Sequence, residues 1–306
     1  MSVIRKEAYY PSSDGVHDIR ALIWYDDEKE PAGVFQIAHG IAEHIGRYDR
    51  FARKLADNGY VVCGSDHLGH GKSIRAISEL GSIDVPDPCE HLVADLHALT
   101  HIMSRRYPDL PYFLFGHSLG SMLSKIYATV WGKELAGLIL CGSGCVPPAG
   151  TAAVNGIKDL FGGFPPVRLS SVSNPLSSKL LFGENDPDAW LSRSKVNREN
   201  YKDDPFCGIK LRDSWVKASA EAILRASASD WSEKVPKELK ILFISGAKDI
   251  VGFNGAAVIK QADQLSEAGI EPTVILYPGD RHEILFEEDC ELVEKDVLGW
   301  LKAARE

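Results

Sequence analysis

The sequence predicts an α/β protein in which a mostly parallel, eight-stranded sheet is flanked by helices and interrupted by a helical insertion. Three observations lead to this fold class. Short runs of β-branched and aromatic residues alternate with longer stretches of helical periodicity, as in chains where a helix connects each strand to the next. These runs are mainly apolar rather than alternating, as expected of parallel strands that are covered on both faces. The stretch 146–231 breaks the alternation, because it has many prolines and no clear buried strand.

The strands are predicted in chain order from these apolar runs. Segments 3–10 and 18–25 flank the turn-forming sequence Pro-Ser-Ser-Asp-Gly, so we expect the sheet to begin with an antiparallel hairpin. The other six strands are expected at 34–38, 60–64, 112–115, 137–141, 240–245 and 273–277.

The helices are predicted from apolar residues that recur every three or four positions. Segment 91–107 carries leucine and methionine at this spacing, which gives a helix one buried face. The same periodicity appears directly after Ser118 and again at 255–268 and 290–304. The insertion at 146–231 is interpreted as a helical cap, with 1–145 and 232–306 as the two parts of one α/β core.

Composition excludes several classes of protein. The 306 residues are 44% hydrophobic and 25% charged, which is typical of a globular chain rather than a disordered or fibrous one. With 34 Lys and Arg against 43 Asp and Glu, the net charge is −9 and the basic residues do not cluster, so nucleic acid is not an expected partner. The chain starts without a signal-like apolar stretch, and no apolar run approaches about 18 residues, so we expect a cytoplasmic protein.

The cysteines are scattered singly. None forms the Cys-x-x-Cys pair of a structural zinc or redox site, so buried free thiols are expected. The six are Cys63, Cys89, Cys141, Cys145, Cys207 and Cys290.

The motif with the clearest chemistry is Gly116-His117-Ser118-Leu119-Gly120, which follows the predicted strand 112–115 and precedes a helical stretch. This strand–turn–helix context is the one that a nucleophile elbow requires. Glycines on both sides of the serine let neighbouring backbone approach the tight turn. We therefore predict that Ser118 is a catalytic nucleophile.

A serine hydroxyl needs a base to take its proton and an acid to orient that base. Asp249 follows the predicted strand 240–245, and His282 follows the strand 273–277, so both lie where parallel strands end. Their order after Ser118 is serine, acid, histidine. Asp280 is the competing acid, but it would have to fold back on the histidine's own loop, and Asp249 is favoured.

An oxyanion hole should complete this triad. Its first donor is expected to be the backbone N–H of Leu119, directly after the nucleophile. The second is expected in His39-Gly40-Ile41, which follows the strand 34–38, and is assigned to the backbone N–H of Ile41.

Two other kinds of site fit the sequence less well. Gly71-Lys72-Ser73 resembles the end of a phosphate-binding loop, but Asp66 stands where the motif needs glycine. His39, His44, His67 and His70 could in principle cluster around a metal, but hydrogen bonds within their loops explain these residues without one. We therefore predict neither a metal nor a cofactor.

With these residues in place, the sequence resembles the α/β-hydrolase family, and within it the monoacylglycerol lipase and lysophospholipase group that also carries the serine aminopeptidase label. Beyond the triad, the resemblance lies in three stretches. They are His39-Gly40-Ile41-Ala42-Glu43-His44-Ile45-Gly46-Arg47-Tyr48, Asp66-His67-Leu68-Gly69-His70-Gly71-Lys72-Ser73 and Arg281-His282-Glu283-Ile284-Leu285, with Ala42 where the group often has glycine.

The resemblance implies a cap where the insertion was placed, and a polar pocket end near the glycerol hydroxyls. Glu43, Arg47 and His117 are expected to contact substrate there, together with the cap residue Tyr201, which precedes an Asp-Pro pair. For Glu43 and Arg47 the alternative is an ion pair that anchors a helix.

The resulting hypothesis is a serine carboxylic-ester hydrolase that works through an acyl-enzyme on single-chain lipid esters, either a monoacylglycerol or a lysophospholipid. The alternatives are an aminopeptidase or amidase that grips an α-amino group with cap carboxylates, a small-ester carboxylesterase, and a binding module without catalysis. The cap is also expected to make transient contact with membrane surfaces. Its apolar residues would shelter an acyl chain or pack the cap onto the body: Leu160, Phe161, Phe164, Leu180, Leu181 and Phe182.

Overall fold

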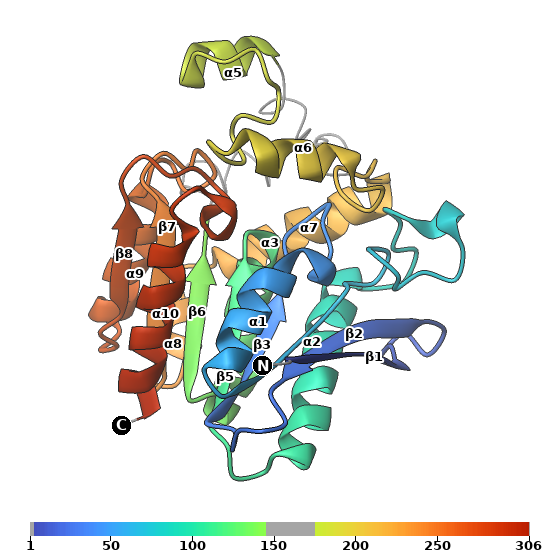
Figure 1. Cartoon of the computed structure of the whole chain (residues 1–306), viewed down its shortest axis with the longest axis vertical. Helices are drawn as coiled ribbons and strands as arrows, with labels where there is room; N and C mark the ends of the chain where they lie inside the picture. The colour runs from blue at the N-terminus through green and yellow to red at the C-terminus, as the bar shows by residue number, and fades with distance from the viewer. Residues whose placement is uncertain (1–2, 145–174, 306) are drawn as a thin grey trace.

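The computed structural model describes residues 3–144 and 175–305, which form an eight-stranded sheet between layers of helices (Figure 1). The strand order is β1-β2-β4-β3-β5-β6-β7-β8. β1 pairs with β2 and β2 with β4 in antiparallel orientation, and all other neighbours are parallel. The strands are β1 (Ile4–Pro11), β2 (Asp18–Tyr25), β3 (Gly33–Ala38), β4 (Tyr60–Ser65), β5 (Tyr112–His117), β6 (Gly137–Cys141), β7 (Lys240–Gly246) and β8 (Thr273–Tyr277).

The predicted fold class is confirmed, and the strands lie within one or two residues of the predicted positions. Strands β3 to β6 are buried along their whole length, which explains why they are mainly apolar rather than alternating. Gln36 is a polar residue in the middle of β3. Its amide donates to Leu96 O at 2.9 Å and accepts from Thr100 and Tyr112, so its burial costs little.

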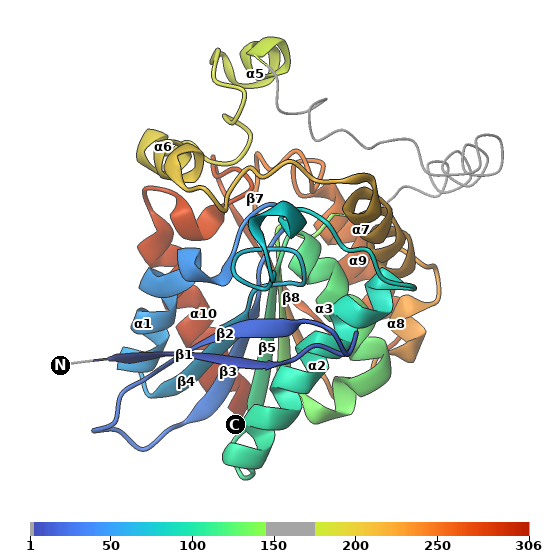
Figure 2. The same ribbon diagram turned by 90° about the vertical axis from the view of Figure 1, so that its right-hand side faces the viewer.

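Helices cover both faces of the sheet (Figure 2). One face carries α1 and α10, and the other carries α2, α3 and α9. The body helices are α1 (Asp49–Asp57), α2 (Pro88–Arg106), α3 (Leu119–Trp131), α9 (Ala256–Glu267) and α10 (Cys290–Arg305). Short 3-10 turns are η1 (Ile45–Tyr48), η2 (Ile77–Glu79), η3 (Gly132–Glu134) and η5 (Ile284–Phe286).

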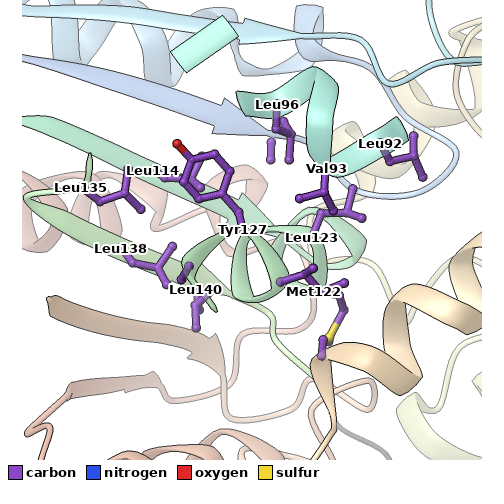
Figure 3. Packing of buried hydrophobic residues seen from close by; sticks show 14 of the residues in the cluster. Leu92, Val93, Leu96, Leu114, Met122, Leu123, Tyr127, Leu135, Leu138 and Leu140 are labelled. Atoms are coloured by element: carbon purple, nitrogen blue, oxygen red, sulfur yellow. The ribbon is translucent and has the colours of Figure 1, made fainter. Parts of the chain in front are cut away.

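The core on the α3 side is built from alternate residues of the strands. Leu138 and Leu140 of β6 meet Leu123 and Tyr127 of α3, while the intervening Ile139 faces the opposite layer (Figure 3). Helix α3 therefore lies on the sheet along an apolar face, and this contact fixes the helix that begins directly after Ser118.

The described part of the predicted cap contains helices and no strand. They are α5 (Pro175–Phe182), α6 (Lys195–Asp203) and α7 (Asp213–Ala226), followed by α8 (Trp231–Lys234). Helices α5 and α6 lie above the carboxyl ends of the strands (Figure 1). Helix α7 differs, because Trp215, Ala218 and Ala222 pack into the core beside α3. The domain boundaries therefore stay a prediction, and α7 is joined to the body by its packing.

The predictions for the cysteines and for the apolar cap residues can be compared with the structure where it describes them. Five cysteines are free and buried, as predicted, whereas Cys145 lies outside the described residues. Of the apolar cap residues, Leu160, Phe161 and Phe164 also lie outside them. None of the described helices combines the length and apolar composition of a membrane span.

The α3 core should dominate stability. Leu123 is fully buried, so Leu123→Ala should lower the free energy of unfolding by about 2–5 kcal/mol through lost burial and a cavity. Leu176 on α5 is 78% exposed, and Leu176→Ala should change it by less than about 0.5 kcal/mol. Urea denaturation of both variants measures the difference. Equal effects in the two variants would contradict this packing.

Candidate active site

Ser118 occupies a strained turn between β5 and α3. Its backbone has φ 52° and ψ −118°, a conformation that side chains other than glycine rarely adopt. The flanking glycines are required by contact: a Cβ on Gly116 would lie 2.4 Å from Gly120 O, and one on Gly120 would lie 2.1 Å from Ala38 O. The turn presents Ser118 at the start of α3, and Leu119 is the first residue of that helix.

His282 and Asp249 are brought together from two loops. His282 Nδ1 donates to the carboxylate of Asp249, with both oxygens at 3.0 Å. Asp249 is fully buried, and its Oδ1 also accepts from the backbone N–H of Val251 at 2.9 Å. Burial alone would lower the pKa of His282, but the charge and hydrogen bond of Asp249 raise it, and the net shift is upward.

Asp280, the competing acid, has a different partner. Its carboxylate is bound by Arg193, which comes from the segment before α6. Burial and the nearby Asp289 raise the pKa of Asp280 to about 7. Asp280 therefore links the histidine loop to the cap, and Asp249 is the acid that contacts His282.

A cavity of about 470 Å³ opens over Ser118 and His282, a size that suits a small-molecule substrate. Within the described residues, no hydrogen bond joins the side chains of Ser118 and His282. The residues that line the cavity come from the oxyanion loop, the nucleophile turn, the histidine loop and the cap. They are Gly40, Ile41, Ala42, Glu43, His117, Ser118, Asp188, Trp190, Leu191, Tyr201, Lys202, Cys207, Gly208, Ile209, His282 and Glu283.

The oxyanion loop lies directly against the nucleophile. A Cβ on Gly40 would lie 3.2 Å from the Cβ of Ser118 and 2.7 Å from Glu43 Oε1, so only glycine allows this approach. Ile41 lines the cavity, and its backbone N–H has no hydrogen-bond partner within the described part of the chain. The loop thus holds a backbone donor next to Ser118, where the sequence placed it.

Glu43 is a buried carboxylate that joins four groups. One oxygen accepts from Gly40 N at 2.5 Å, Tyr48 OH at 2.9 Å and His117 Nδ1 at 3.1 Å, and the other from Arg47 at 2.7 Å. Burial would raise the pKa of Glu43, but Arg47 and His117 lower it well below its usual range. Glu43 is therefore charged, and its hydrogen bonds fix the oxyanion loop.

Arg47 lies behind the cavity wall and does not line the main cavity. It forms a two-fold ion pair with Glu283, at 2.7 and 2.9 Å, in addition to its bond with Glu43. The guanidinium also lies over the rings of Tyr201 and Phe286, 5.0 and 4.3 Å from their centroids. The ion-pair alternative is thus present in the structure, and substrate contact by Arg47 stays a prediction.

Tyr201 and His117 both line the cavity. The Tyr201 hydroxyl donates to Ala42 O at 3.0 Å, so it holds the oxyanion loop from the cap. The His117 ring lies 4.9 Å from the ring of His282. Contacts of either residue with substrate stay predictions.

The histidines that could have bound a metal are engaged in hydrogen bonds. His39 donates to Gly40 O and accepts from His67 N, and the His67 ring donates to His39 O. Burial lowers the pKa of His39 to about 4 and that of His67 to about 3, so both are neutral. His70 accepts from Ala42 N at 3.0 Å.

A different trio has the spacing of a metal site. The ligand atoms of His44, Asp204 and Cys207 lie within 4.8 Å of one another. However, His44 Nδ1 accepts from Gly46 N, so the ring proton sits on Nε2 and is donated to Asp204 at 2.9 Å. The nitrogen that faces the trio is therefore a donor, not a metal ligand.

Some residues at the site lie outside the motifs that the sequence shows. Trp190 lies on His282, with ring centroids 5.3 Å apart, and its carbonyl accepts from His282 N at 3.4 Å. Asp188, Lys202 and Ile209 also line the cavity. These residues belong to the cap, where no fixed spacing marks a site residue, so sequence reasoning could not find them.

A known protein family matches most of this chain. Residues 29–289 match the model of the family described as "Serine aminopeptidase, S33". The chain belongs to this family. The predicted family and fold class are thereby confirmed, and with them the prediction of a hydrolase.

Similar proteins point to the same group. A monoacylglycerol lipase of Mycolicibacterium smegmatis is 27% identical over 94% of this chain and 94% of its own length. A monoglyceride lipase of Mus musculus is 26% identical, over 89% of this chain and 82% of its own. The structure of a carboxyl esterase from Bacillus coagulans, in complex with glycerol, is 28% identical and superimposes over 100% of both chains with a TM-score of 0.86.

The His282–Asp249 pair predicts a measurable titration. The imidazolium should persist above the ordinary pKa of 6.5, so the stability it contributes is full below that pH and is lost as pH rises through the native pKa. Asp249→Asn should lower the His282 pKa, because the carboxylate charge is removed. NMR titration of the ring nitrogens measures both values. A native pKa at or below 6.5 would contradict the assignment.

Proposed function

We propose that this chain hydrolyses carboxylic esters through an acyl-enzyme, with Ser118, His282 and Asp249 as the catalytic triad. Ser118 Oγ attacks the ester carbonyl while His282 takes its proton. Asp249 holds the imidazole and stabilises its positive charge. The backbone N–H groups of Ile41 and Leu119 stabilise the negative charge on the carbonyl oxygen.

The first half of the reaction ends with loss of the alcohol, and the second half repeats the attack with water. His282 donates its proton to the leaving alcohol, which departs and leaves the acyl group on Ser118. Water then attacks the acyl-enzyme as His282 takes a proton from it. His282 returns this proton to Ser118, and the fatty acid is released.

The observation that carries the proposal is the convergence of three loops on one cavity. The strained turn at Ser118, the loop of His282 and the loop that bears Ile41 come from different strand ends and line the same space, and Asp249 binds His282 from behind. A binding module has no need of this combination, since a strained nucleophile and a paired histidine contribute nothing to affinity.

The lining favours a neutral leaving group. Three carboxylates line the cavity, those of Glu43, Asp188 and Glu283, whereas the cations beside them are two, the Lys202 ammonium and the Arg47 guanidinium that binds Glu43 and Glu283. This excess of negative charge disfavours the phosphate of a lysophospholipid and suits the hydroxyls of glycerol. Together with the names of the similar proteins, it supports a monoacylglycerol as the substrate class.

The aminopeptidase alternative fits the cap less well. An α-amino group would need a cap carboxylate, but Glu184 is bound by Arg198 and Arg281, and Asp186 by Arg198 and Lys202. Asp204 is bound by His44. Only Asp188 among the acids of the described cap lines the cavity, 3.8 Å from Lys202.

Fatty acid release from a monoacylglycerol and a lysophosphatidylcholine of the same chain length tests the proposal. Wild type should cleave the monoacylglycerol at least ten-fold faster in kcat/KM, and Ser118→Ala should lower that rate by about 10³-fold or more, because the nucleophile is lost. An aminoacyl amide serves as the third substrate. Release that persists in Ser118→Ala would overturn the triad, and faster cleavage of the amide would favour the peptidase.

We also propose that the enzyme acts in the cytoplasm and takes lipid substrates from a membrane surface through the cap. Support comes from α5, where Leu176, Leu180 and Leu181 are exposed, with Leu180 at 84%. This helix stands away from the body, above α6, in both views (Figures 1 and 2). Exposed leucines on such a helix can enter the headgroup region of a bilayer.

Replacing Leu180 tests this contact. Leu180→Ser should lower the hydrolysis of a long-chain monoacylglycerol in vesicles several-fold, because apolar contact with the bilayer is lost. Hydrolysis of a dissolved short-chain ester should not change. Val196→Ser on α6, also exposed, is the matched control. Equal loss on both substrates would contradict a role in membrane contact.

A further inference from the structure

The peptide groups of Ala42 are held from two sides. Ala42 follows Ile41 and has φ 56°, a left-handed conformation that is unfavourable for alanine. Its N–H donates to His70 Nε2 at 3.0 Å, and its carbonyl accepts from Tyr201 OH at 3.0 Å and from Gly208 N at 2.9 Å. Three hydrogen bonds thus meet at the residue next to the proposed oxyanion donor.

The two sides belong to different parts of the molecule. His70 lies in the loop after β4, in the body, whereas Tyr201 is in α6 and Gly208 follows it, in the cap. His70 is itself packed against Trp215 of α7, with ring centroids 4.3 Å apart. The position of Ala42 therefore depends on contacts from both the body and the cap.

The neighbouring peptides are held as well. Gly40 N donates to Glu43, and Gly40 O accepts from His39. The N–H of Ile41 lies between these fixed groups and has no partner within the described residues. The orientation of this N–H is thus set by the bonds at Gly40 on one side and at Ala42 on the other.

We propose that His70 is a positioning residue for the oxyanion hole, and that the cap completes the hole by holding Ala42 through Tyr201 and Gly208. This inference rests on the proposed function, since it concerns the donor Ile41 in ester hydrolysis. It gives Tyr201 a role that does not require contact with glycerol.

The role requires an unprotonated Nε2 on His70. A protonated ring would point an N–H at the N–H of Ala42, and the bond would be lost. Burial, with His39 and His67 nearby, lowers the pKa of His70 well below its usual value. Nε2 therefore remains an acceptor at the pH values where His282 can act as a base.

His70→Leu and His70→Gln test the body side, because only the glutamine can offer an acceptor to Ala42 N. The substrate is p-nitrophenyl butyrate, which has no glycerol, and the probe of the oxyanion hole is an alkyl trifluoromethyl ketone that adds to a serine. His70→Leu should lower kcat about 10- to 100-fold, with KM within about three-fold, because the hole is misplaced in the transition state. Affinity for the ketone should fall by a similar factor, and His70→Gln should recover most of both.

Tyr201→Phe tests the cap side and keeps the ring over Arg47. It should lower kcat several-fold on the same ester. Tyr10→Phe is the matched control, because it also removes a buried hydroxyl that donates to a backbone carbonyl, that of Asp95 at 2.9 Å, but in β1, none of whose residues lines the cavity. Tyr10→Phe should leave kcat unchanged.

Equal losses in His70→Leu and His70→Gln, or losses confined to KM, would overturn the inference. If thermal unfolding shows that His70→Leu does not fold, the other variants decide. Near-wild-type kcat in His70→Gln together with reduced kcat in Tyr201→Phe, relative to Tyr10→Phe, supports the inference. Unchanged kcat in Tyr201→Phe overturns it. Ser118→Ala distinguishes a failure of this inference from a failure of the proposed function. Wild-type hydrolysis that does not need Ser118 would refute that function itself.

Discussion

The buried carboxylate of Glu43 connects the parts of the site that must stay in register. A charge removed from water is costly unless it is fully paired, and Glu43 meets this condition with Arg47, Tyr48, His117 and the N–H of Gly40. Arg47 extends the pairing to Glu283, beside His282. The oxyanion loop, the nucleophile turn and the histidine loop are therefore held by one network, and the loss of Arg47 would leave the buried charges of Glu43 and Glu283 without their cation.

Strain at the site is balanced by this network and by packing. Ser118 and Ala42 both have positive φ, and neither residue is glycine. At Ser118 the turn is held between β5 and the buried face of α3. At Ala42 it is held by hydrogen bonds from His70 and the cap. Rigid placement of backbone donors is what an oxyanion hole needs, because donors that must reorient during the reaction lose much of their benefit.

The sequence was sufficient to predict the strands, the fold class and a serine, acid and histidine at strand ends, because apolar runs and glycine spacing are local properties. The bond between His282 and Asp249 fits that prediction. The sequence could not show that Arg47 lies behind the cavity wall, because the direction of the Arg47 side chain depends on its ion pair with Glu283, more than 200 positions away. The contact of Trp190 with His282 and the hydrogen bond from Ala42 to His70 were missed for the same reason, because both join segments that are distant in the sequence.

The most direct test of the central claim is the intact mass of the protein after reaction with an alkyl fluorophosphonate. This reagent adds once to a serine that has an adjacent base and an oxyanion hole. The structure predicts one adduct per chain, on the peptide that contains Ser118, and none in Ser118→Ala. An unlabelled wild type, or equal labelling in the variant, would contradict the assignment of Ser118 as the nucleophile.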